Sequence, residues 1–107
     1  MVSEDAMSEL HAVCAGAQEM TEAAFSYIYL PKLKLPGTLG VVDALLCLQQ
    51  HSGYSTRLFL SSQVHRKGSN WSSHQILGKT WYTWSWKDVS AELRPVQILL
   101  GHLKALR

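Results

Sequence analysis

The sequence lacks several features that would assign it to a membrane or nucleic-acid class. No apolar run approaches the roughly 18 to 20 residues that a membrane-spanning helix needs, and Glu4, Asp5 and Glu9 stand where a signal peptide carries positive charge. Lys and Arg are scattered, apart from a small group at Arg66 and Lys67, and the net charge is only +2. We therefore expect a cytoplasmic protein without membrane contact, and nucleic acid is an unlikely partner.

Motifs that commonly carry catalysis are also absent. There is no serine-centred nucleophile elbow, no phosphate-binding glycine loop and no paired-carboxylate motif. The two cysteines, Cys14 and Cys47, each lie in an apolar segment, which favours buried free thiols over a disulfide. His11 and Cys14 have the spacing of a metal-binding pair, but zinc needs three or four ligands and no second clustered pair exists. The sequence predicts no metal site and no cofactor.

What the sequence does contain is the composition of an ordinary globular domain. It has 107 residues, of which 47% are hydrophobic and 17% are charged. A chain of this length can bury a core without disulfides or a structural metal. We expect a single domain over residues 1–107, with its core in about residues 25–106.

Hydrophobic periodicity predicts a helix near each end of the chain. The N-terminal helix is expected over about residues 3–20, starting at the capping Ser3. Its apolar positions are Met7, Leu10, Cys14 and Ala17. In the C-terminal helix Pro95 suits the first turn, and His102 is expected at the boundary of the apolar face. That face is predicted to comprise Val96, Leu99, Leu100, Leu103 and Leu106.

Between these helices the pattern changes to that of β-strands. The segment 25–30 is aromatic and β-branched and stops at Pro31, and the segment 41–50 is apolar on both faces, as in a central strand. The segment 56–64 predicts a third strand. The polar residues 65–73 are expected to form an exposed loop. This order predicts an α+β domain in which an N-terminal and a C-terminal helix flank an antiparallel β-meander.

Two residues of the predicted central strand combine polarity with an apolar setting. A carboxylate at Asp43 lies either at a solvated edge or beside a buried donor, because leaving it unpaired would be costly, and we favour a structural hydrogen bond or salt bridge over a site role. Cys47 is flanked by Leu46 and Leu48, which indicates a small packed hydrophobe rather than a reactive thiol.

Three tryptophans stand within the short segment GKTWYTWSWKDV. Neither a helix nor a strand places Trp81, Trp84 and Trp86 on one side, so at least one must face differently. We expect the run to act mainly as a structural clamp over the sheet, with Trp86 at its margin. That indole, together with Tyr82 and Trp71, is the candidate hot spot for a protein partner. Base stacking on single-stranded nucleic acid is the other alternative.

The order of these motifs resembles one known family. The stretches LPGTLG, VVDALLCL and SGY, followed by GKTWYTWSW and LRPVQILLGHLKAL, are similar to prokaryotic family E of the ubiquitin-conjugating superfamily. That family has a W-x-x-W-S element before its last helix, which Trp81, Trp84 and Ser85 match. The resemblance covers about residues 25–106. It implies a ubiquitin-conjugating-like fold, often found beside ubiquitin-like, activating and deconjugating components.

The resemblance also implies where a catalytic cysteine would stand. In active members a cysteine after the meander, commonly near a His-Pro-Asn element, carries ubiquitin as a thioester. The corresponding region, about residues 65–81, contains His65 and His74 but no cysteine, and Cys47 lies too early. We therefore expect a noncatalytic protein that binds a ubiquitin-like or operon-encoded partner in a bacterial conjugation-type system, with Cys47 and His74 as the remaining catalytic candidates.

Two other functions stay open at this point. A reactive Cys47 or Cys14 would make the chain a transferase of ubiquitin-like modifiers. A nucleic-acid binder would instead use basic and aromatic side chains, and its affinity would fall steeply with salt. The residues predicted to bind a partner are Trp71, Tyr82, Trp86, Arg66 and Lys67.

Overall fold

The computed structural model describes residues 3–22, 25–35, 40–49, 56–63, 71–84, 89 and 92–104. These residues form two helices and six strands: α1 (Glu4–Val13), β1 (Gln18–Glu22), β2 (Phe25–Lys34), β3 (Val41–Cys47), β4 (Arg57–Leu60), β5 (Trp71–Ile76), β6 (Lys79–Trp84) and α2 (Pro95–Lys104). Within these ranges, no helix combines the length and apolarity needed to cross a bilayer. The predicted α+β class, with antiparallel strands and a helix near each end, is confirmed.

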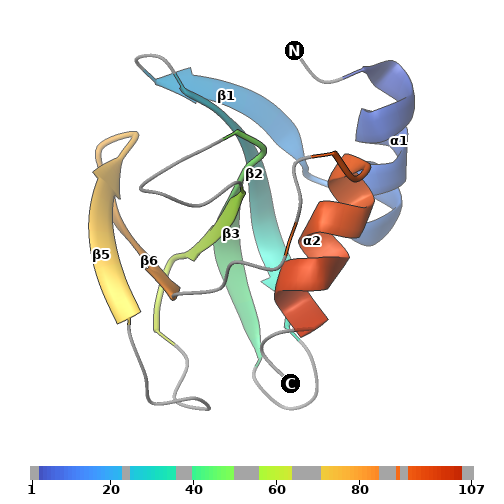
Figure 1. The fold of residues 1–107 in the computed structure, drawn as a ribbon. Helices are drawn as coiled ribbons and strands as arrows, with labels where there is room; N and C mark the ends of the chain where they lie inside the picture. Colours follow the sequence, from blue (N-terminus) through green and yellow to red (C-terminus); the bar gives the residue numbers. More distant parts are fainter. Residues whose placement is uncertain are drawn as a thin grey trace.

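One antiparallel sheet contains all six strands in the order β1-β2-β3-β4-β6-β5. Strands β1 to β4 form the meander, and the pair Leu60 and Tyr82 joins it to the β5–β6 hairpin. The predicted central strand is confirmed, since β3 lies between β2 and β4. Both helices pack on one side of the meander, and the hairpin lies on the other side (Figure 1).

The sheet curls strongly, so that the hairpin covers the meander face opposite the helices. The Trp81 ring meets the Tyr29 ring edge to face with centroids 6.4 Å apart, although β3 and β4 separate their strands in the sheet. At the hairpin tip, the backbone N–H of Leu77 donates to Glu22 Oε2 over 2.7 Å. The hairpin therefore reaches the opposite edge strand of the same sheet.

The alternation of side chains along the strands divides the core into two clusters. Beneath the helices lie Leu10, Cys14, Ala17, Ile28, Leu30, Leu33, Leu35, Ala44, Leu46, Leu58, Leu60, Val89, Ile98, Leu99 and Leu103. Beneath the hairpin lie Tyr27, Leu45, Cys47, Phe59, Ile76 and Trp81. Because β3 and β4 contribute to both clusters, their residues are apolar on both faces, as the sequence predicts for a central strand.

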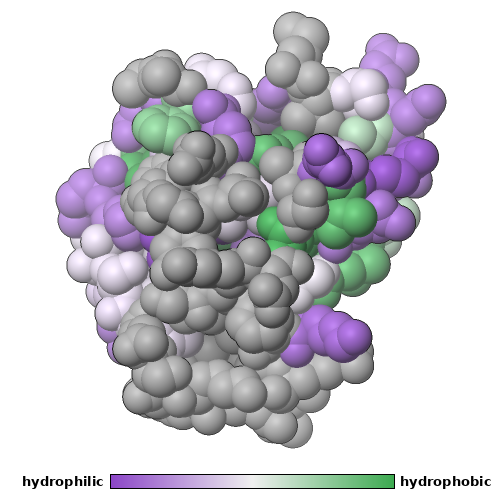
Figure 2. All heavy atoms as spheres, viewed as in Figure 1, coloured by the Kyte–Doolittle hydropathy of each residue, from purple (hydrophilic) through white to green (hydrophobic). Residues whose placement is uncertain are grey.

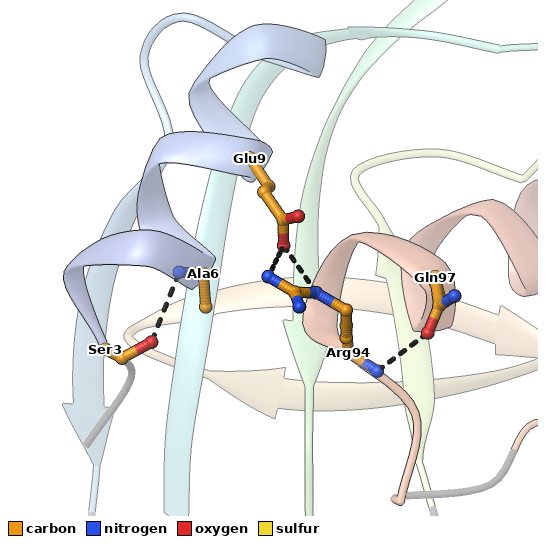
Figure 3. Close-up of polar contacts among 5 residues, drawn as sticks. All are labelled: Ser3, Ala6, Glu9, Arg94 and Gln97. Carbon is orange, nitrogen blue, oxygen red and sulfur yellow. Dashed lines mark hydrogen bonds and ion pairs between the residues drawn. The ribbon is translucent and has the colours of Figure 1, made fainter.

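Helix α1 is shorter than the predicted range of about 3–20. The Ser3 hydroxyl caps it by accepting from the Ala6 N–H (Figure 3), but the helix ends at Val13. Residues Gln18–Glu22 form β1 instead and pair with β2. At Gly16 the chain passes so close to Pro31 that a Cβ atom would lie 2.7 Å from the proline ring. Pairing with β1 provides hydrogen-bond partners for backbone N–H and C=O groups of β2. These groups would lack partners in the sheet if residues 18–22 continued the helix.

Strand β2 continues past Pro31, where the sequence predicts that it stops. The register with β3 shifts between Leu30 and Leu33, and a proline inside a strand is tolerated at such an irregularity. Lys32 adopts a left-handed conformation with φ of 54°, and its N–H donates to Asp43 Oδ1 over 3.0 Å. The predicted structural hydrogen bond of Asp43 is confirmed.

Helix α2 buries Leu99 and Leu103 and packs Val96 against the core, as predicted, but its buried face is turned toward Ile98 and His102. Ile98, Leu99, His102 and Leu103 are its buried residues, whereas Leu100 is 51% exposed. Leu106 lies outside the described residues. The buried positions follow the same three-and-four spacing as the predicted face, so periodicity alone does not choose between them. His102 is therefore not a boundary residue, since it is only 2% exposed.

The predicted loop 65–73 is also partly wrong. Its last three residues, 71–73, belong to β5 and pair with β6. The remainder of that segment lies outside the described residues. The side chains of Ser72 and Ser73 are solvent exposed, so short polar residues are tolerated in this strand. Such residues give no hydrophobic pattern from which a strand could be predicted.

Candidate functional site

The register of the β5–β6 hairpin decides which candidate residues share a face. Side chains directly opposite each other in an antiparallel pair project from the same face, and successive residues alternate. Ser73 lies opposite Tyr82, and His74 lies opposite Trp81. Since Trp81 points into the core against the meander, Tyr82 projects from the outer side of the hairpin.

The outer side of the hairpin brings together two of the predicted binding residues. Trp71 and Tyr82 are both half-buried. They are diagonal neighbours, because Tyr82 pairs with Ser73 and Trp71 lies two positions before Ser73 on β5. Trp71 also packs against the core beneath the helices, which restricts its motion. We call Trp71, Ser73, Gln75, Thr80 and Tyr82 the hairpin face.

Polar groups surround the aromatic pair on the hairpin face. Ser73, Gln75 and Thr80 are exposed, and the Gln75 side-chain amide donates to the Thr80 hydroxyl. These three residues retain hydrogen-bonding capacity toward a partner. The face therefore combines half-buried aromatic rings with a polar margin, which is the composition of a protein interface.

Trp81 fulfils the clamp role predicted for the tryptophan run. It is 3% exposed, and its Nε1–H donates to the Ile76 carbonyl over 3.0 Å. Trp86 lies outside the described residues, as do Arg66 and Lys67. The binding roles predicted for these three residues stay predictions.

Both cysteines are buried free thiols, as predicted. The Cys47 thiol donates to the Gln49 carbonyl over 3.3 Å and is 0% exposed. The Cys14 thiol donates to the Pro31 carbonyl over 3.2 Å. Burial raises the pKa of Cys14. Burial also raises the pKa of Cys47, and the Gln49 backbone and the Arg57 charge offset this only in part.

His74, the second catalytic candidate, lies on the inner face of β5. Its ring meets the Phe59 ring edge to face at 5.4 Å, and its Nε2 lies 3.5 Å from the Ser72 hydroxyl. Burial lowers the pKa of His74, and the Arg57 guanidinium lowers it further. The imidazole is therefore neutral near pH 7 and packs as a ring against an aromatic neighbour.

The pair His11 and Cys14 makes hydrogen-bonding contacts with two different backbone carbonyls. His11 Nε2 lies 2.8 Å from the Ala17 carbonyl oxygen, and the Cys14 thiol is bonded to Pro31. Among the residues that the structure describes, no group of three His, Cys, Asp or Glu side chains is placed to hold a metal ion.

Sequence reasoning missed a buried polar network around His102. The Thr56 hydroxyl donates to the Val89 carbonyl over 3.0 Å, and His102 Nε2 lies 2.9 Å from the same hydroxyl oxygen. Because threonine has a single hydroxyl hydrogen, His102 Nε2 must be the donor in the second bond. Burial lowers the pKa of His102 to about 4, with a further contribution from Arg57. Position 102 lies one turn after Ile98, so the helical spacing was compatible with burial of His102 but did not single it out.

Comparisons of the chain with protein family models, with curated protein sequences and with solved structures found no match. The resemblance of residues 25–106 to the ubiquitin-conjugating superfamily therefore stays a prediction. The candidate site rests on the geometry of the hairpin and of the two thiols.

Proposed function

We propose that this chain is a noncatalytic protein-binding module of ubiquitin-conjugating-like architecture, whose hairpin face binds a ubiquitin-like or operon-encoded protein. The observation that carries the proposal is the burial of both cysteines. The chain has only two, and neither sulfur is accessible to a second protein: Cys14 is 6% exposed and Cys47 is 0% exposed.

Thioester transfer makes demands that these thiols do not meet. A thiolate must form, and its sulfur must reach an activated carbonyl carbon. Burial raises the pKa of both thiols, and each S–H group is engaged with a backbone carbonyl. These contacts oppose the alternative of a cysteine-dependent transferase.

The hairpin face supports the binding half of the proposal. Tyrosine and tryptophan dominate protein-binding hot spots because they offer a large contact area with few rotatable bonds. Trp71 and Tyr82 are half-buried, and packing against the core beneath the helices already restricts Trp71 before a partner arrives. A partner would order little additional structure there, which reduces the entropic cost of association.

The order of elements supports the architectural half of the proposal. A helix, an antiparallel meander, a tryptophan-bearing strand and a last helix follow one another along the described chain. This is the order that the family resemblance implies for residues 25–106, with α1 preceding it. The sequence pattern did not predict the strands β1 and β5.

Binding is tested by truncating the two aromatic rings of the hairpin face. We expect Tyr82→Ala and Trp71→Ala each to weaken binding to the proteins encoded by neighbouring genes about tenfold or more. Isothermal titration calorimetry measures the affinity, and circular dichroism establishes that each variant is folded. Thr21→Ala, an exposed site on β1, is the matched control and should bind as the wild type does. A partner that binds both aromatic variants with unchanged affinity refutes the role of this face.

The noncatalytic character is tested by thiol titration of the native protein at neutral pH. We expect both cysteines to react with a thiol reagent only after denaturation, because both sulfurs are buried. Rapid reaction of one thiol in the folded protein would instead favour the transferase, and the Cys47→Ala and Cys14→Ala variants identify which thiol reacts.

A further inference from the structure

Strand β5 forms one outer edge of the sheet, and β1 forms the other (Figure 1). The hairpin turn consists of two residues, Leu77 and Gly78, closed by the pair Ile76 and Lys79. In such a hairpin the backbone groups of the closing pair are hydrogen bonded to each other. Every second residue before Ile76 also directs its backbone N–H and C=O groups toward β6. Ser73 and Gln75 therefore direct their N–H and C=O groups away from β6, toward the open edge.

The described residues of β5 carry none of the charges, prolines or bulges that usually prevent a strand from pairing with another strand. Natural edge strands carry charged side chains, prolines or β-bulges. The segment WSSHQI contains no Lys, Arg, Asp, Glu or Pro, and all six of its residues pair with β6 in an unbroken register. The opposite edge strand differs, because β1 carries the carboxylates of Glu19 and Glu22.

We propose that β5 pairs antiparallel with β5 of a second copy of this chain, around a two-fold axis, and so joins two sheets edge to edge. The proposal goes beyond the proposed function, because it concerns the backbone edge of β5 and stands whether or not the hairpin face binds a ubiquitin-like protein. Symmetric pairing of this kind gives a closed dimer, the commonest form of homo-oligomer.

The absence of charge on β5 favours a second copy as the occupant. Two-fold antiparallel pairing places Ser73 and Gln75 of one copy beside the same residues of the other. Any charge on the strand would therefore lie close to a charge of the same sign on the second copy, which is destabilising. The strand has none, and the lowered pKa of His74 keeps that side chain neutral at pH 7. Identical pairing of β1 would instead bring carboxylates together. On the left of Figure 2, where the hairpin lies in this view, the coloured residues are mostly purple to white.

The pairing is tested with two charged double variants of the edge. Ser73→Lys/Gln75→Lys and Ser73→Glu/Gln75→Glu each oppose like charges across the two-fold axis, so we expect each alone to dimerise about tenfold more weakly than the wild type. An equimolar mixture of the two variants places lysines opposite glutamates and should restore the dimer. Sedimentation velocity over micromolar to millimolar concentrations gives the dissociation constants, and circular dichroism establishes the fold.

The matched control is Gln18→Lys/Thr21→Lys, which adds the same charge to exposed positions of β1 and should dimerise as the wild type does. A wild-type chain that stays monomeric at millimolar concentration overturns the proposal. So does a dimer that the edge variants leave intact, or a monomer whose β5 edge binds an extended peptide of different sequence. Tyr82→Ala leaves the backbone of β5 unchanged, so loss of partner binding in that variant with the dimer retained separates the two proposals.

Discussion

At the scale of single residues, the environment decides the role more than the residue type does. Trp81 and Tyr82 are neighbours in β6, yet Trp81 is packed between the hairpin and the meander while Tyr82 lies on the outer side. Cys47 and Arg57 are directly opposite each other on β3 and β4, and the Arg57 charge would activate an exposed thiol. Burial outweighs that charge, so Cys47 acts as a small hydrophobic residue.

The buried and the outer aromatic residue of β6 should respond differently to truncation. Trp81→Ala should lower the free energy of unfolding by about 3 to 5 kcal/mol, because it leaves a cavity and removes the hydrogen bond to Ile76. Tyr82→Ala should lower it by only about 1 kcal/mol, since the ring is half-buried. Urea denaturation measures both values. Equal mild losses would show that Trp81 is not a clamp.

Replacing the buried thiol should affect stability and leave binding unchanged. Cys47→Ala removes one sulfur atom from the cluster beneath the hairpin, and we expect a loss of about 1 kcal/mol in the free energy of unfolding. Binding of a partner to the hairpin face should be unaffected. A transfer activity that disappears in this variant while the fold survives would contradict the noncatalytic proposal.

At the scale of elements, the β5–β6 hairpin depends on its two-residue turn. Leu77 and Gly78 have φ values of 52° and 78°, the left-handed conformations that a tight hairpin turn requires. The Leu77 N–H is also the group that reaches Glu22 on β1. The same turn thus sets the register of the hairpin face and holds the hairpin over the meander.

Alanine at the second turn position should weaken the hairpin through the backbone alone. A Cβ atom on Gly78 would meet nothing within 4 Å, so the cost of Gly78→Ala is the left-handed conformation itself, about 1 to 2 kcal/mol in the free energy of unfolding. Thr80→Ala, an exposed site in the same hairpin, should change it by less than about 0.5 kcal/mol. Denaturant unfolding compares the two, and a stabilising Gly78→Ala would contradict the turn geometry.

At the scale of the whole molecule, a few polar contacts join elements that are far apart in the sequence. Arg94, next to α2, forms an exposed ion pair with Glu9 of α1, with 2.9 Å between Nη2 and Oε1 (Figure 3). Exposed pairs of this kind contribute little. The buried bonds among Thr56, Val89 and His102 contribute more, because they join the residue before β4, the segment before α2 and α2 itself without access to water.

The His102 network predicts that the protein loses stability in mild acid. Burial lowers the folded-state pKa of His102 from its ordinary value of 6.5 to about 4, so the unfolded chain binds the proton more tightly. The full stabilisation is present above pH 6.5 and is lost as the pH falls from 6.5 to 4. The difference between the two pKa values corresponds to about 3 kcal/mol.

Urea unfolding at a series of pH values between 7 and 4 measures this dependence. His74 contributes in the same direction, since burial lowers its pKa as well. The His102→Gln variant should therefore be less stable at pH 7 and should show a shallower, though not flat, decline toward acid. An unchanged slope in that variant would assign the pH dependence to other groups.

The sequence by itself determined the features that depend on neighbours along the chain. The cap at Ser3, the helix that begins at Pro95, the apolar strand around Cys47 and the burial of both thiols all follow from local spacing and composition. Their physical signal is a run of side chains that one helix face or one strand must bury, and such a run is visible without any long-range contact.

Only the tertiary structure decided where the chain pairs with distant segments. Polar strand β1 replaced the end of the predicted helix because it pairs with β2, and Ser72 and Ser73 entered a strand because β6 lies beside them. The buried face of α2, and with it His102, depended on how that helix meets the meander. The hairpin face likewise required the fold of β5 and β6 over the sheet, because the side on which Trp81 is buried determines where Trp71 and Tyr82 point.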